Sequence, residues 1–247
     1  MINTNELIQY CNQYLDVDNF KDYCPNGLQV QGKNTIKSII SGVTASQALI
    51  DKAIELKADA ILVHHGYFWK NENPTITGIK YQRIQKLIEH EINLIAYHLP
   101  LDAHPEVGNN VLLAKALNID ITGSFGPNQL ALSGRISLCS GEELTSTINQ
   151  VLNREALHIP ADKKIETVGL CTGAAHSFID DAILAGVDAY ISGEISESTV
   201  HIARENNIHY FAAGHHATEC FGARALGNHL AKHFDLQHQF IDLYNPV

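Results

Sequence analysis

The chain has no excess of positive charge and no stretch of lysine or arginine that could follow a nucleic-acid backbone. Its 247 residues include 17 lysines and arginines against 27 aspartates and glutamates, a net charge of −10 with histidine neutral. Extended DNA or RNA binding is therefore disfavoured. A single nucleotide is not excluded, because a metal ion can supply the missing positive charge.

Long apolar runs and paired cysteines are also missing. No apolar run approaches the roughly 18 residues of a membrane span, and the N-terminal segment MINTNELIQYCNQYL is polar and amphipathic, so we expect no membrane helix and no signal peptide. The five cysteines are scattered and form no CxxC motif, which fits a reducing compartment. We therefore expect a cytoplasmic protein in which Cys171 and Cys220 are structural thiols.

The sequence contains no Walker motif, no dinucleotide fingerprint and no GxSxG nucleophile motif. Two turns, SGVTASQ (41–47) and CTGAAHS (171–177), could offer backbone N–H groups to a phosphate. Capping of the following helices by Thr44, Ser46 or Ser177 is the favoured interpretation of these turns.

The chain repeats itself. ELIQYCNQYL (6–15) recurs as ELTSTINQVL (143–152), LIDKAIELKADAILVHHG (from 49) resembles FIDDAILAGVDAYISGEI (from 178), and HLPLD (98–102) aligns with HHATE (215–219). Three matches in the same order indicate an internal duplication. The first half holds about a dozen extra residues, most simply in Gly66–Gly78. We predict domains at 1–125 and 126–247, because GSFGPNQ at their boundary is rich in turn formers.

Each half alternates short β-rich runs with helices of apolar periodicity. The predicted strands are 37–43, 58–63 and 92–97 in the first half and 167–173, 187–192 and 208–213 in the second, and the helices after the first strands are 46–57 and 176–186. This alternation predicts an α/β fold with a largely parallel sheet covered by helices. Ligands of such sheets gather beyond the carboxyl ends of the strands.

Imidazole and carboxylate groups follow three of these predicted strands. His64 and His65 come directly after the strand AILV, Asp102 follows the strand INLIAY, and His215 and Glu219 follow IHYFAA. Neighbouring side chains inside a strand point to opposite faces, but the backbone can turn at the strand end and let both imidazoles converge. Residues i and i+4 share a face on a helical turn, which would bring His215 and Glu219 together.

These ligand types suit Zn, Mn, Fe, Co or Ni, and none is soft enough to select one of these ions. Five side chains exceed the three protein ligands of a usual catalytic zinc. They suit two divalent metal ions about 3.5–4 Å apart with a bridging carboxylate, for which we choose Glu219. His64, His65, Asp102 and His215 complete the predicted ligand set.

Other candidate residues keep more than one interpretation. His98 is the repeat partner of His215, so it is a candidate ligand, a group that orients a ligand, a proton shuttle, or a packed loop histidine; His216 is a weaker candidate. Glu194, the repeat partner of His65, is better explained by the dipole of the following helix. We expect ordinary surface or core roles for five histidines outside this pattern, which are His90, His158, His229, His233 and His238.

Five segments together resemble one known family. ILVHHGYFWK, YHLPLDAHPEVGNN, CTGAAHSFID, ISGEISE and AAGHHATE look like the bacterial YbgI-type branch of the GTP cyclohydrolase 1 type 2 homologue family, the Nif-three-like family. The resemblance covers nearly the whole chain except roughly 124–165. It implies two similar interlocked α/β domains, a ring-shaped homohexamer, and dinuclear metal sites that face the inside of the ring.

Carried over by motif, the resemblance implies the same five ligands. His64 and His65 match the tandem histidines of the family, Asp102 matches its HxxxD aspartate, and the GHxxTE segment supplies His215 and the bridging Glu219.

Two classes of function follow from these residues. The leading hypothesis is a metal-dependent hydrolase of a nucleotide or related heterocycle, with His98 as general acid or base because its ordinary pKa near 6.5 suits proton transfer. If the family label holds, the attack falls on the purine imidazole carbon and releases formate. The alternative is a non-enzymatic metal-delivery protein or a regulatory ring that binds partners.

Overall fold

The computed structural model describes residues 1–247 and divides into two compact units. Unit 1 comprises Met1–Val107 and Gly222–Tyr244, and unit 2 comprises Gly108–Phe221 and Asn245–Val247. No helix combines the length and the apolar character that a membrane span requires. The predicted domains 1–125 and 126–247 follow the sequence repeat rather than this packing, and that boundary remains a prediction.

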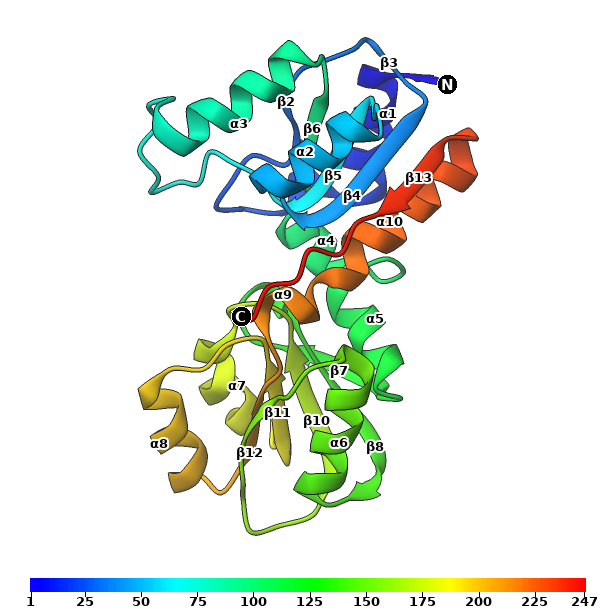
Figure 1. Ribbon diagram of the computed structural model, residues 1–247. Coiled ribbons are helices and arrows are strands. Elements are labelled where there is room, and N and C mark those ends of the chain that lie inside the picture. Colours follow the sequence, from blue (N-terminus) through cyan, green and yellow to red (C-terminus); the bar gives the residue numbers. More distant parts are fainter. The chain divides into compact units, whose positions relative to one another are not determined.

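Unit 1 is built on a five-stranded sheet with the strand order β13-β4-β5-β6-β2 (Figure 1). Its strands are β2 (Gly27–Val30), β4 (Ser38–Thr44), β5 (Ala60–His65), β6 (Asn93–Ala96) and β13 (Gln237–Phe240). The first four strands in this spatial order are parallel, and only β2 pairs antiparallel, with β6. A short ladder of β1 (Ile2–Asn3) and β3 (Thr35–Ile36) lies apart from this sheet.

Helices cover both faces of this sheet, because side chains that alternate along the buried strands are apolar on both faces. On β5, Leu62 belongs to a core cluster with α1 (Thr4–Tyr14) and α10 (Cys220–Phe234). Its neighbours Ile61 and Val63 belong to the other cluster, with α2 (Gln47–Glu55) and α3 (Gly78–Glu89). The chain also forms a 3-10 turn at Val17–Asn19 and the short helix α4 (Leu99–Ala103).

Unit 2 repeats this plan on a six-stranded sheet with the order β7-β8-β10-β11-β12-β9. Its strands are β7 (Asp120–Phe125), β8 (Ala131–Cys139), β9 (Leu157–Ile159), β10 (Ile165–Cys171), β11 (Ala189–Ser192) and β12 (His209–Ala212). Strands β10, β11 and β12 are parallel, while β7, β8 and β9 pair antiparallel. The predicted strands of each half therefore form parallel centres, and the antiparallel outer strands were not predicted.

The helices of unit 2 also lie on both faces. One cluster contains residues of α5 (Asn109–Ala116) and α6 (Gly141–Leu152). The other contains residues of α7 (Ile179–Leu184) and α8 (Glu197–Glu205). The short helix α9 (His215–Thr218) follows β12, and 3-10 turns occupy Pro127–Gln129 and His176–Phe178.

The duplication is visible in the order of elements. The series α1-β2-β4-α2-β5-α3-β6-α4-α5-β7 is matched by α6-β9-β10-α7-β11-α8-β12-α9-α10-β13. The extra residues of the first half lie, as predicted, between β5 and α3, where the loop covers 66–77, whereas the equivalent loop between β11 and α8 covers only 193–196.

The last long helix of each repeat contributes to the core of the unit that is built mainly from the other repeat. Helix α5 ends the first repeat, yet Leu113 and Ala114 belong to a core cluster of unit 2. Helix α10 ends the second repeat, yet Leu226 and Leu230 belong to a core cluster of unit 1. A cut at the repeat boundary would therefore remove a buried helix from each core.

His238 is one of the histidines expected in a structural role, and it connects β13 to its neighbours. Its Nε2 lies 2.7 Å from Ser41 Oγ on β4, and its Nδ1 lies 2.8 Å from Asn228 Oδ1 on α10. A Cβ at Gly227 would lie 2.1 Å from the imidazole, so only glycine fits there. Burial lowers the pKa of His238 from its ordinary 6.5 to about 4.

This exchange of helices α5 and α10 between the repeats can be tested with two fragments of the chain. We expect a fragment of residues 108–221 to show a helical circular dichroism spectrum and cooperative thermal unfolding, because it contains nearly all of unit 2. A fragment of residues 126–247 lacks α5 and β7 and should lack a cooperative transition. Equal cooperativity of the two fragments would contradict the exchange.

The pH dependence of stability tests the half-buried His238. The unfolded histidine takes up a proton near pH 6.5 but the folded one only near pH 4, so stability is complete above about 6.5 and falls toward 4. Between pH 7 and pH 5 we expect a His238→Gln variant to lose about 1 kcal/mol less free energy of unfolding than the natural protein, allowing for the partial exposure of the side chain. Urea unfolding measures this, with the exposed His90→Gln as control. Identical pH slopes in all three proteins would contradict the assignment.

Candidate metal centre

In unit 1 the two tandem histidines converge at the end of β5. The centroids of the His64 and His65 rings lie 4.7 Å apart, with a 49° angle between the rings. The strand runs through both residues rather than ending before them, and Thr44 on β4 pairs with His65. His64 is fully buried, and His65 is partly exposed.

His98 and Asp102 join these two residues from the loop after β6. The ring of His98 lies 5.0 Å from that of His64 and 5.8 Å from that of His65. One nitrogen of each of the three imidazoles lies within 4.8 Å of the others. Asp102 is buried on α4, and its Oδ1 lies 3.4 Å from His64 Nε2. Unit 1 therefore gathers three imidazoles and one carboxylate.

Protein oxygens hold the other ring nitrogens of the tandem pair. His64 Nδ1 lies 3.0 Å from the backbone oxygen of Tyr97, and His65 Nδ1 lies 3.2 Å from Thr44 Oγ1. A carbonyl oxygen can only accept, so His64 carries its proton on Nδ1 and presents an unprotonated Nε2 when neutral. This arrangement is typical of histidines that bind a metal. Thr44, considered above as a helix cap, contacts His65, and Ser46 caps α2 instead.

Asp22 fixes the orientation of His98. Asp22 Oδ1 lies 2.6 Å from His98 Nδ1, and the backbone N–H of Leu99 donates to Asp22 Oδ2 over 2.9 Å. Asn26 supports both residues, because its amide donates to Asp22 and its Oδ1 accepts the backbone N–H of His98. Burial alone raises the pKa of Asp22, but its hydrogen bonds, above all that with His98, lower the pKa below its ordinary value. Asp22 is therefore a carboxylate that holds the imidazole.

Cys24 lies near the same pair, since its sulfur, Asp22 and His98 offer ligand atoms within 4.8 Å of one another. Burial and the neighbouring Asp22 raise the pKa of its thiol to about 12. Because a metal binds the thiolate rather than the thiol, Cys24 is a poor ligand, and the Nδ1 of His98 is already bound to Asp22.

In unit 2, His215 and Glu219 lie together after β12. His215 Nε2 is 3.2 Å from Glu219 Oε2, as the i,i+4 spacing predicts. His215 Nδ1 is 2.6 Å from Glu194 Oε1. Glu194 therefore binds the outer nitrogen of this histidine, a contact that the helix-dipole interpretation did not predict.

A glycine makes room for the buried Glu219 carboxylate. A Cβ at Gly173 would lie 2.2 Å from Glu219 Oε1, and its φ of +68° also favours glycine. The hydroxyl of Thr218 accepts the backbone N–H of Gly173 over 3.1 Å and donates to the backbone oxygen of His215 over 2.9 Å. These contacts hold the loop after β10 against the start of α9.

The carboxylates control the protonation of His215. Burial alone lowers its pKa, but Glu219 and Glu194 outweigh burial and raise the pKa to about 9. An imidazolium has no lone pair for a metal, so a cation that binds here must replace that proton. Two carboxylates around one imidazole therefore form a place for positive charge.

Within each unit, the donor atoms fit a divalent metal ion of the borderline class. Candidate nitrogen and oxygen donors cluster at the carboxyl ends of parallel strands. The Nδ1 atoms of His64 and His215 are held by oxygen atoms. Unit 1 brings together His64, His65, Asp102 and His98, and unit 2 brings together His215 and Glu219. That these residues bind a metal remains a prediction, and so does the catalytic role of His98.

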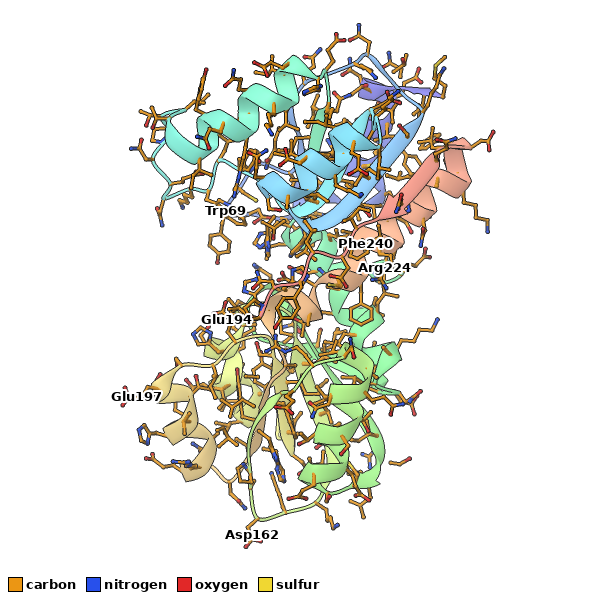
Figure 2. The ribbon with its side chains drawn as sticks, in the orientation of Figure 1. Trp69, Asp162, Glu194, Glu197, Arg224 and Phe240 are labelled. Carbon is orange, nitrogen blue, oxygen red and sulfur yellow. The ribbon has the colours of Figure 1, made fainter.

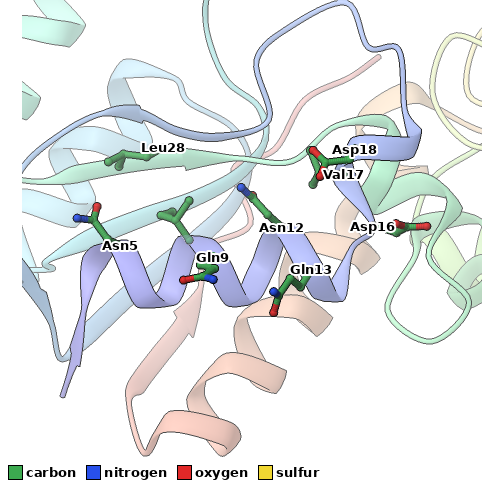
Figure 3. Close-up of a pocket in the computed structure, with 9 residues that line it drawn as sticks. Asn5, Gln9, Asn12, Gln13, Asp16, Val17, Asp18 and Leu28 are labelled. Atoms are coloured by element: carbon green, nitrogen blue, oxygen red, sulfur yellow. The ribbon is translucent and has the colours of Figure 1, made fainter.

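A groove of about 600 Å³ lies elsewhere in unit 1, along α1 (Figure 3). Its polar lining consists of four carboxamides and two carboxylates, Asn5, Gln9, Asn12, Gln13, Asp16 and Asp18. It is lined by no histidine, so it contains none of the predicted ligands.

Sequence reasoning missed Asp22 and the contact of Glu194. Asp22 lies 76 positions from His98 and outside the repeated segments, so no spacing could connect them. Glu194 could have been found, because its repeat partner is His65, which ends β5, and Glu194 follows the equivalent strand β11.

The fold and these residues define a duplicated α/β protein with imidazole and carboxylate clusters at its strand ends. A family model described as Duf34/NIF3 (NGG1p interacting factor 3) matches residues 2–246. The chain belongs to this family, as the resemblance implied. A relative from Vibrio cholerae is 54% identical with both chains fully covered, and one from Escherichia coli K12 is 50% identical over 98% of each chain. Both relatives are named GTP cyclohydrolase 1 type 2 homolog.

Solved structures agree with this fold. The protein ybgI, described as of unknown function, is 48% identical and superimposes with a TM-score of 0.97 over all of both chains. A crystal structure of a protein from Thermus thermophilus is 33% identical with a TM-score of 0.85, again over all of both chains. HcgD of Methanocaldococcus jannaschii, at 23% identity and a TM-score of 0.85 over 98% of each chain, shares the fold.

Proposed function

We propose that the chain binds two divalent metal ions and uses them to hydrolyse a nucleotide or a related heterocycle. His64, His65 and Asp102 are the proposed ligands from unit 1, and His215 and the bridging Glu219 are those from unit 2. The ion is one of Zn, Mn, Fe, Co or Ni, because the donors are nitrogen and oxygen atoms without thiolate.

One repeated observation carries the metal proposal. The histidine after β6 and the histidine after β12 each have a carboxylate oxygen 2.6 Å from Nδ1, from Asp22 and Glu194 respectively. Each is also followed by a carboxylate four positions later, Asp102 or Glu219. A structural histidine needs no such pair of acidic neighbours, whereas a metal site uses one as ligand and the other to orient the ring.

The hydrolase proposal adds a role for His98. A pair of bound divalent cations lowers the pKa of water toward neutrality and stabilises negative charge on a reacting group. Asp22 accepts the Nδ1 proton of His98 in a hydrogen bond, so Nε2 is the nitrogen that can accept or donate a proton near the cluster. Asp22 is then a positioning residue.

The names of the relatives point to a nucleotide substrate. The relatives described above are named GTP cyclohydrolase 1 type 2 homolog, and we extend that chemistry to this chain as a proposal. The attack would fall on the purine imidazole carbon and release formate. The homohexameric ring implied by the resemblance is part of the same proposal, and sedimentation velocity at micromolar concentration measures it.

Metal content is the first test. Elemental analysis of protein purified without added metal should give about two ions per chain. His64→Ala should remove most of them, because a buried imidazole is lost from the cluster.

A matched control separates ligand loss from the loss of any histidine. His201→Ala removes an exposed imidazole on α8 and should keep the full metal content. One ion per chain or fewer in the natural protein after loading with each candidate metal would contradict the dinuclear proposal.

Turnover tests the hydrolase. Metal-loaded protein incubated with GTP and other nucleotides should release formate or change the ultraviolet spectrum. Asp22→Asn should keep the metal content but lower kcat about 10- to 100-fold, because the carboxylate no longer holds the Nδ1 proton and the orientation of His98. Its pH–rate profile should shift as well, which a purely structural role would not cause.

Two results would contradict this mechanism. The first is the absence of turnover with every nucleotide under several metals, together with transfer of labile metal to a chelating acceptor, which would favour the metal-delivery alternative. The second is an Asp22→Asn variant with unchanged kcat and pH profile.

A further inference from the structure

We infer that Trp69 and Tyr23 form a binding surface for a flat heteroaromatic ring beside the histidines of unit 1. The inference rests on the proposed function in one respect, because it makes this ring the base of the substrate. Trp69 is the only tryptophan of the chain and is labelled in Figure 2.

The two aromatic side chains border His98. The centroid of the Trp69 ring lies 5.0 Å from that of His98, with an angle of 87° between the rings, and 5.9 Å from that of His65. The ring of Tyr23 lies 6.4 Å from His98 at 66°. Tyr23 is 60% exposed, so much of its ring is accessible to a ligand. Both rings thus lie at the edge of the imidazole cluster.

The loop that carries Trp69 is held by specific contacts. The backbone N–H groups of Phe68 and Trp69 donate to Glu72 Oε2 over 3.1 and 3.2 Å. Lys80 on α3 pairs with the same carboxylate at 2.8 Å. The backbone N–H of Lys70, the residue after Trp69, donates to the backbone oxygen of Tyr23 over 2.7 Å, so the loop that carries Trp69 is bound to Tyr23.

The loop also contains a strained backbone position. Phe68 has a φ of +66°, in the left-handed region that bulky side chains rarely adopt. Such strain persists where surrounding contacts impose it, and it clusters at functional sites. Here the contacts of Glu72 and Lys80 impose it, and the residue that follows is Trp69.

Packing does not require Trp69. It belongs to neither apolar cluster of unit 1. The equivalent connection of the second repeat, 193–196, closes without any aromatic residue. The longer loop of the first repeat therefore adds an indole beside the histidines that the common fold of the repeats does not need.

The chemistry of this surface suits a nucleobase. Every base has a flat π face, and stacking on tryptophan or tyrosine is favourable whichever base is present. The imidazoles of His98 and His65 lie 5.0 and 5.9 Å from the indole, so polar groups of a stacked base would be close to them. A sugar phosphate without a base lacks the flat face.

The single tryptophan provides the measurement. Fluorescence excited at the indole is followed while metal-loaded and metal-stripped proteins are titrated with guanosine, adenosine and ribose 5-phosphate. We expect saturable quenching by both nucleosides and none by ribose 5-phosphate. Equal quenching by ribose 5-phosphate, or no saturable quenching by any nucleoside, would overturn the inference.

Variants identify the residue responsible. By calorimetry, Trp69→Ala should weaken guanosine binding about ten-fold, while Trp69→Phe, which keeps a flat ring, should retain most of the affinity. Tyr81→Ala removes an aromatic side chain that is 50% exposed on α3 and should have no effect. Unchanged affinity in Trp69→Ala would overturn the inference.

Metal analysis of the same variants separates the two proposals. Trp69→Ala should keep its metal content, whereas His64→Ala should lose metal and still quench with guanosine. Quenching without metal or turnover would leave ring binding intact and contradict the hydrolase alone. Metal binding and turnover without quenching by nucleosides would contradict ring binding and leave the hydrolase proposal intact.

Discussion

The burial of parallel strands on both faces is the constraint on which the rest of the structure depends. Strands such as β5 and β11 are apolar on both sides, so each sheet needs two helices on each face. Single polar side chains such as Ser41 on β4 occur inside the strands, but a cluster of them has room only at the strand ends. The histidines and carboxylates therefore gather there, on backbone that the apolar layers hold in place, and the exchange of α5 and α10 meets the same demand for cover.

Polar side chains at the strand ends are arranged by hydrogen bonds rather than by packing. A backbone carbonyl, a hydroxyl and two carboxylates bind the Nδ1 atoms of the histidines at the ends of β5, β6 and β12. These bonds orient the rings before any ligand arrives, so a metal that binds loses little free energy in ordering the side chains. The same carboxylates favour positive charge, as the raised pKa of His215 shows.

The two repeats have diverged around this common frame. The first repeat has the tandem histidines and the long loop with Trp69, whereas the second has Glu194 at the position of His65 and a short connection. A duplicated unit offers two equivalent strand ends, and only one of them needs to bind the organic part of a substrate. This asymmetry is the physical basis for assigning metal ligands to both repeats but ring binding to the first alone.

The sequence by itself determined the α/β alternation, the duplication and the position of the candidate ligands at the strand ends, because periodicity and repeats are local properties. It also located the extra residues between β5 and α3. It could not assign α5 and α10 to the units that they complete, since an amphipathic helix has the same pattern whichever sheet it covers. The pairing of the antiparallel strands β2 and β9 and the Asp22–His98 pair were decided by the tertiary structure alone, because they join residues far apart in the chain through contacts that leave no spacing in the sequence.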